Sequence, residues 1–191
     1  INRSGSGYRL GAQTPNAAGA RSTTFAIAAG AAAGLDFVEQ PVTTTAGVTM
    51  PLFRVRVIDA FGNRVQSFVG NVSVAISVNP GGGTLSGTTT AAVVDGFATF
   101  DALSINKSGT GYRFQATSGA LTADESNAFS ILGAAPVRIA FTVQPTQTRA
   151  GLSITPIVRV TGFDQFDNVA TFGVGGTATV TITAGVRGPT G

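Results

Sequence analysis

The chain has 191 residues, of which 43% are apolar and 11% charged, and its formal net charge is only +3. It contains no Cys and no His, which excludes disulfide bonds, zinc sites built on thiolates or imidazoles and hydrolytic centres in which His activates a nucleophile. Its basic residues are scattered singly, unlike the clusters of nucleic-acid-binding proteins, and no apolar run reaches the ~18 residues of a membrane span. We therefore expect a non-enzymatic protein without cofactor, nucleic-acid partner or membrane span in this segment.

The first ten residues recur later in the chain. Residues 1–10 read INRSGSGYRL and residues 105–114 read INKSGTGYRF, a spacing of 104 positions. At the same spacing, Phe25-Ala-Ile27 matches Phe129-Ser-Ile131. Such a period predicts a tandem array in which each unit is a separate domain.

The recurrence sets the expected domain boundaries. Residues 1–34 match the C-terminal strands of a partial unit, residues 35–134 form a complete unit, and residues 135–191 match the N-terminal half of a further unit. A complete unit has the commonest domain size. Two interpretations of the partial units stay open: they are cut from a longer array, or another copy completes them by strand pairing.

Within the complete unit, residues 52–58 read LFRVRVI and alternate between apolar and basic side chains. This two-residue period predicts a half-buried strand with Phe53, Val55 and Val57 facing inward. Residues 72–78 have the same period, with Val72, Val74, Ile76 and Val78 expected inward. Further short strands are expected at residues 91–94, 97–100, 112–116 and 128–131. No segment shows the apolar stripe of an amphipathic helix, so the pattern predicts an all-β antiparallel sandwich of two sheets.

Four motifs of the complete unit together resemble a known family: Gln40-Pro41, Val57-Ile-Asp-Ala-Phe-Gly-Asn63, Gly96-Phe-Ala-Thr-Phe100 and Ser108-Gly-Thr-Gly-Tyr112. They resemble the bacterial Ig-like repeats of cell-surface and secreted proteins, similar to those in the stalks of intimin and invasin. The resemblance covers nearly the whole chain. It implies tandem Ig-like antiparallel β-sandwich domains of about 104 residues per repeat, in an extracellular structural array such as an adhesin stalk or a surface filament. The fold by itself implies no ligand.

Two tyrosines occupy matching positions, Tyr8 and Tyr112, each after a glycine. Both look like the tyrosine corner of Ig-like sandwiches, in which the hydroxyl bonds to nearby backbone. Leu10 and Phe114 lie two residues later, where antibody domains have a Cys, and we expect these apolar side chains to fill the core. All four residues are assigned structural roles.

The pattern Asp-x-Phe-x-Asn occurs at residues 59–63 and again at residues 164–168. Carboxylate and amide oxygens suit calcium, which takes six to eight of them. The weak candidates for such a site are Asp59, Asn63, Asp164 and Asp167. They are too few to complete a coordination shell, so we expect no metal, and instead a turn in which Asp bonds backbone amides.

Phe61 and Phe166 lie inside these two turns, where polar residues are usual. We expect each ring to tuck under its own loop. The alternative is that both protrude and contact a neighbouring domain or another chain, because an exposed apolar group can mark an interface.

These observations predict a structural and interaction protein that forms a rod, an adhesin stalk or a surface fibre and could polymerise by strand complementation. Its expected partners are neighbouring Ig-like repeats, of the same chain or of identical chains. The alternative is a carbohydrate-binding or spacer module of a secreted enzyme. Sugar platforms usually expose Trp and Tyr, whereas this chain has no Trp and its two tyrosines are assigned to corners.

Overall fold

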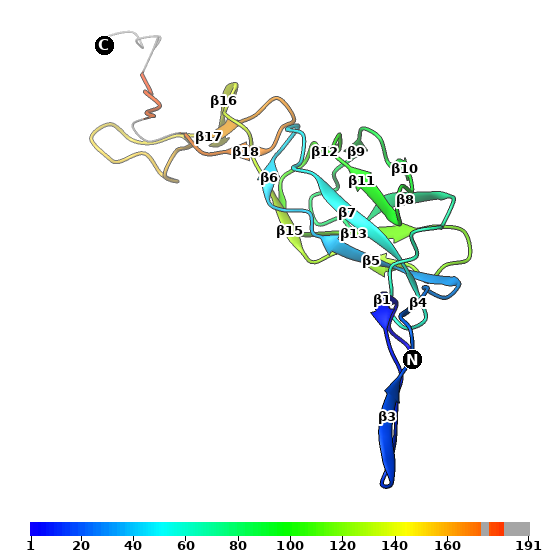
Figure 1. Ribbon diagram of the computed structural model, residues 1–191. Helices are drawn as coiled ribbons and strands as arrows, with labels where there is room; N and C mark the ends of the chain where they lie inside the picture. Colours follow the sequence, from blue (N-terminus) through cyan, green and yellow to red (C-terminus); the bar gives the residue numbers. More distant parts are fainter. Residues whose placement is uncertain (173–175, 182–191) are drawn as a thin grey trace, which may run out of the picture. The chain divides into compact units, whose positions relative to one another are not determined.

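The computed structural model describes residues 1–172 and 176–181. The chain divides into two compact units, Ile1–Leu132 and Gly133–Gly191. Every regular element in the described residues is a β-strand (Figure 1), so the predicted all-β class is confirmed. In these residues no helix is long and apolar enough to cross a membrane. Of the half-unit expected at 135–191, residues 173–175 and 182–191 lie outside the described part.

Two layers of mainly antiparallel strands make up most of the first unit and give it a sandwich-like form. One sheet has the order β11-β7-β5, with bounds Phe97–Phe100, Phe53–Asp59 and Ala32–Glu39. The other has the order β10-β8-β13-β15-β6, with bounds Thr90–Ala92, Asn71–Val78, Gly109–Thr117, Phe129–Leu132 and Thr44–Thr45. Its β14 (Asp124–Glu125) pairs with β13, and β6 runs parallel to β15. A two-stranded sheet joins β9 (Leu85–Ser86) to β12 (Ser104–Ile105).

Strand β7 has the alternation that its sequence predicts. Phe53, Val55 and Val57 are fully buried, while Arg54 and Arg56 lie on the opposite, half-buried face. Strand β8 follows its prediction only at first: Val72 and Val74 are buried, Ile76 is half-buried and Val78 is exposed. The register of β8 against β13 shifts at this end of the strand, and such an irregularity bends a strand and re-aims its side chains.

Aromatic rings join the two layers. Phe53 of β7 stacks on Phe114 of β13 with ring centroids 5.6 Å apart, and on Phe100 at 5.3 Å. Phe114 in turn packs against Phe129 at 5.0 Å. Pairs at such distances contribute beyond their buried area, so this cluster holds the sheets face to face.

The N-terminal residues form two small sheets of their own. Strand β1 (Gly5–Tyr8) pairs with β4 (Phe25–Ile27), and β2 (Gly11–Thr14) pairs with β3 (Ala17–Arg21). Leu10 lies between β1 and β2 and is 62% exposed, so its predicted core role is wrong in this structure, whereas Phe114 is fully buried. The reason is that Phe114 packs against Phe53 of the opposite sheet and against Phe129, whereas β2 pairs in the described residues only with β3.

The second unit contains a three-stranded antiparallel sheet in its described part. Its order is β16-β17-β18, with bounds Arg138–Val143, Arg159–Phe163 and Val169–Ala170. The Asp164 loop connects β17 to β18, as the Asp59 loop follows β7 in the first unit.

Candidate functional site

The first Asp-x-Phe-x-Asn loop begins at Asp59, the last residue of β7. The Asp59 side chain is only 3% exposed, and its Oδ1 accepts hydrogen bonds from the backbone N–H groups of Phe61 and Asn63, each at 2.9 Å. Gly62 has a φ of 79°, a left-handed conformation that glycine adopts without steric cost. The loop is thus the predicted turn in which Asp binds backbone amides.

The second oxygen of Asp59 reaches a distant part of the chain. Its Oδ2 accepts the backbone N–H of Gly30 at 2.8 Å and the side-chain Nδ2 of Asn63 at 2.9 Å. Gly30 lies two residues before β5 begins. One buried carboxylate therefore fixes the segment that enters the sandwich to the loop that follows β7.

The second loop repeats this arrangement atom for atom. Asp164 is 1% exposed, and its Oδ1 accepts the N–H groups of Phe166 at 2.8 Å and Asn168 at 2.9 Å. Its Oδ2 accepts the N–H of Ala134 at 2.9 Å and the Nδ2 of Asn168 at 2.8 Å. Each Asp holds the residue about thirty positions upstream, with separations of 29 for Gly30 and 30 for Ala134.

These bonds stabilise the charged form of both carboxyl groups. The Asn63 amide, aided by the N–H groups of Gly30, Asn63 and Phe61, lowers the pKa of Asp59 to about 2 against the raising effect of desolvation. For Asp164, desolvation alone would raise the pKa, but the hydrogen bonds from Asn168, Ala134 and Phe166 outweigh it and the pKa is lowered. Both loops therefore contain a carboxylate at neutral pH, because hydrogen bonds to the charged form favour ionisation.

The weak metal candidates have other contacts. The oxygens of Asp59 and Asp164 face N–H donors, Asn63 bonds to Asp59, and the Asp167 carboxylate pairs with Arg138 at 2.7 Å. In the described part of the chain, no group of three or more acidic, His or Cys residues could hold a metal ion. Asp59 and Asp164 are each a carboxylate surrounded by hydrogen-bond donors.

Asn63 also contacts the N-terminal residues. Its Nδ2 donates to the carbonyl oxygen of Asn2 at 2.8 Å, and its Oδ1 accepts the backbone N–H of Ser4 at 2.9 Å. Asp59 and Asn63 together therefore hold two upstream segments, at Gly30 and at residues 2–4.

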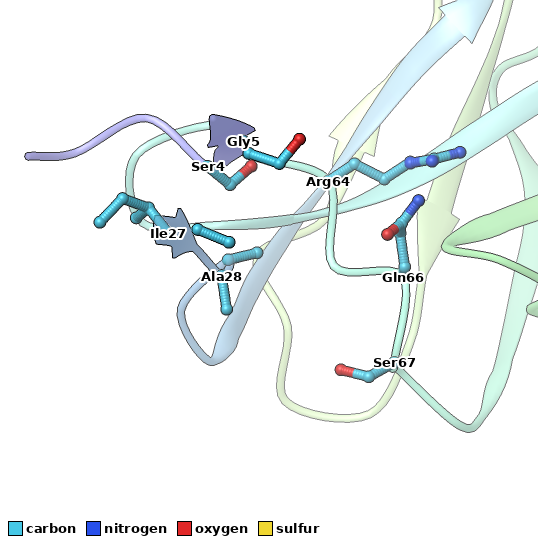
Figure 2. Close-up of a pocket in the computed structure, with 10 residues that line it drawn as sticks. Ser4, Gly5, Ile27, Ala28, Arg64, Gln66 and Ser67 are labelled. Carbon is cyan, nitrogen blue, oxygen red and sulfur yellow. The ribbon is translucent and has the colours of Figure 1, made fainter. Parts of the chain in front are cut away.

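A cavity of about 580 Å³ lies beside these contacts. Figure 2 shows residues of the N-terminal segment, such as Ser4 and Ile27, on one side and the loop from Arg64 to Ser67 on the other. Arg64 is the only charged residue in the lining, and its guanidinium pairs with Asp95 at 3.1 Å. The lining offers no pair of titratable groups for acid–base chemistry.

Both tyrosines make the bond that a tyrosine corner makes. The hydroxyl of Tyr112 donates to the carbonyl of Lys107, and that of Tyr8 to the carbonyl of Arg3, each at 2.8 Å and five residues upstream. Tyr112 is fully buried. Burial raises its pKa against the opposing effect of hydrogen bonds with the backbone of Gly81 and Gly83. A Cβ at Gly81 would lie 2.4 Å from the Tyr112 hydroxyl, so this turn needs glycine for space.

The two phenylalanines of the loops differ. Phe61 is 68% exposed, so the expectation that it tucks under its own loop is wrong, because Asp59 and Asn63 fill the inside of the turn. Phe166 is half-buried. The exposure of Phe61 leaves the alternative, an interface role, as a prediction.

Sequence reasoning missed the residues that the loops hold. Gly30, Ala134, Asn2 and Ser4 carry no obvious chemistry because they contribute backbone groups. Asn2 and Ser4 recur as Asn106 and Ser108, but the Asn106 Oδ1 accepts the backbone N–H of Thr84 at 2.7 Å. The recurrence therefore gave no signal of the backbone contacts that Asn2 and Ser4 make.

The comparisons with known proteins add little. No family model matches the chain, and no curated protein matches it. A solved structure of a glycosyl hydrolase family 2 member from Bacteroides cellulosilyticus is similar over 58% of this chain, with 14% identity and a TM-score of 0.41. The match spans only 16% of that chain, and a likeness this low carries no argument about function.

Proposed function

We propose that the protein is a non-enzymatic structural and interaction protein, a bacterial extracellular array of tandem Ig-like β-sandwich repeats that forms a rod, an adhesin stalk or a surface fibre. One observation carries the proposal. In each of two loops 105 positions apart in the sequence, 59–63 and 164–168, a buried Asp carboxylate binds the backbone of the segment that enters the unit. Such a repeated contact suits an array in which each unit keeps a fixed connection to the chain before it.

The bonds of these loops suit a mechanical role. Each carboxylate accepts several N–H groups, and hydrogen bonds to an ionised acceptor are shorter and stronger than neutral ones. They restrict the entering segment to one path, which removes the freedom that a short Ala/Gly connection would otherwise have. The matching tyrosine corners further support a repeated unit.

Small-angle X-ray scattering tests this proposal directly. A compact globule of 191 residues would have a radius of gyration of about 16 Å. We expect a clearly larger value, and a linear increase of the maximum dimension when further copies of residues 35–134 are joined in tandem. A radius near the globular value that grows only slowly with added copies would contradict the array.

A further inference from the structure

Two polar groups of the backbone flank a bend in the N-terminal segment. The chain bends at Arg3, immediately before β1. The carbonyl of Asn2 and the N–H of Ser4 lie on either side of this bend, and both bond to the side-chain amide of Asn63. A primary amide carries a donor and an acceptor side by side, so one side chain satisfies both groups.

The tyrosine corner holds the same bend from within. The Tyr8 hydroxyl donates to the carbonyl of Arg3 at 2.8 Å, which belongs to the same peptide group as the Ser4 N–H that Asn63 binds. The same construction recurs at Lys107, where the chain also bends and the Tyr112 hydroxyl donates to the carbonyl at 2.8 Å. In each case the tyrosine fixes the backbone shape that precedes the strand.

Asp59 determines which way the Asn63 amide points. An ionised carboxylate only accepts hydrogen bonds, so the Nδ2 of Asn63 must face Asp59, at 2.9 Å from its Oδ2. The Oδ1 of Asn63 is then directed to the Ser4 N–H. The donor and acceptor of the amide are thereby matched to the bend without ambiguity.

We propose that Asn63 is a docking site for the tyrosine-corner bend of the preceding repeat, that Asp59 orients its amide, and that Tyr8 prepares the bend. This rests on the proposed function, since it treats residues 1–34 as the end of a preceding repeat. The Asn63 amide binds only backbone groups of the bend, so the site accepts any side chain at this position. The tyrosine corner then acts in the joint between repeats as well as inside its own sheet.

Spin-label distance measurements on the whole chain test the joint. The chain has no Cys, so Thr24→Cys and Thr99→Cys place labels only on two exposed sites, one beside β4 and one on β11. We expect a single narrow distance distribution for the otherwise unchanged chain and a broad one for Asn63→Ala. Asn127→Ala is the matched control, because Asn127 is exposed and its own hydrogen bonds involve its backbone. A narrow distribution in Asn63→Ala, or a broad one in the unchanged chain, overturns the proposal.

Two further variants change the bend and leave the loop at residues 59–63 unaltered, so their results do not depend on whether a loop variant folds. Tyr8→Phe leaves Asp59 and Asn63 intact, and we expect it to broaden the distribution and to accelerate hydrogen exchange of the Ser4 N–H by about tenfold, the usual effect of losing one hydrogen bond. Arg3→Ala should change neither quantity. Unchanged exchange in Tyr8→Phe, or a broadened distribution in Arg3→Ala, contradicts a backbone-reading joint. A failed joint with elongated scattering would leave the proposed array standing, whereas compact scattering would remove the array itself.

Discussion

The loops at residues 59–63 and 164–168 share two anchor residues, the Asp at the first position and the Asn at the last. They differ at some of the positions between these two residues. In both, Asp and Asn make the same bonds to each other and to the upstream segment. The left-handed position is Gly62 in one loop and Asp167 in the other, with φ values of 79° and 62°. The Asp and Asn residues therefore define the hydrogen-bonded turn, while the residues between them must only permit its backbone conformation.

Removal of the Asp59 anchor should lower the thermal stability more than any other substitution proposed below. Asp59→Ala leaves the N–H groups of Gly30, Phe61 and Asn63 without their acceptor, and a buried donor without a partner is costly. We expect the largest loss of thermal stability among these variants, measured by circular dichroism. Asp101→Ala, at an exposed position, is the control. Equal melting temperatures for the two variants would mean that the carboxylate is not an anchor.

Lowering the pH should remove the stabilising contribution of the Asp59 carboxylate. The pKa of Asp59 is about 2 in the folded chain, below the ordinary 3.8, so its stabilising contribution is complete above the ordinary value and is lost as the pH falls toward 2. We expect the difference in melting temperature between the unchanged chain and Asp59→Asn to be constant from pH 7 to about 4. Below that it should shrink. A difference that persists unchanged at pH 2 would contradict a carboxylate anchor.

Substitution of Gly62, the residue in the left-handed position, should lower the free energy of unfolding less than substitution of Asp59. No atom lies within 4 Å of a Cβ built on Gly62, so Gly62→Ala has only the backbone cost, which is about 1 kcal/mol of unfolding free energy. Gly11→Ala, also with open space but without a positive φ, should cost less. Chemical denaturation of both variants measures the difference. If Gly62→Ala is as stable as Gly11→Ala, the turn does not require its left-handed residue.

The comparison also shows what a sequence can reveal. The alternation of apolar and basic residues in β7 predicted its buried face, because burial depends on the identity of the side chains and the sequence gives that identity. The joint was not predictable in the same way, since Asn63 binds the backbone of Asn2 and Ser4, and backbone groups are the same in every residue. Leu10 was misplaced for a related reason: its core position requires covering strands, which local sequence does not report.

Phe61 should have the smallest effect on stability and separates the two interpretations of its exposed ring. Its backbone N–H anchors the turn, but its side chain is 68% exposed, so Phe61→Ser should change the unfolding free energy by less than about 0.5 kcal/mol. If the ring contacts another chain, the same variant should reduce self-association at high concentration in sedimentation experiments. Unchanged association would remove the interface role. Because an exposed ring costs little to lose, any change in association reports the surface and not the fold.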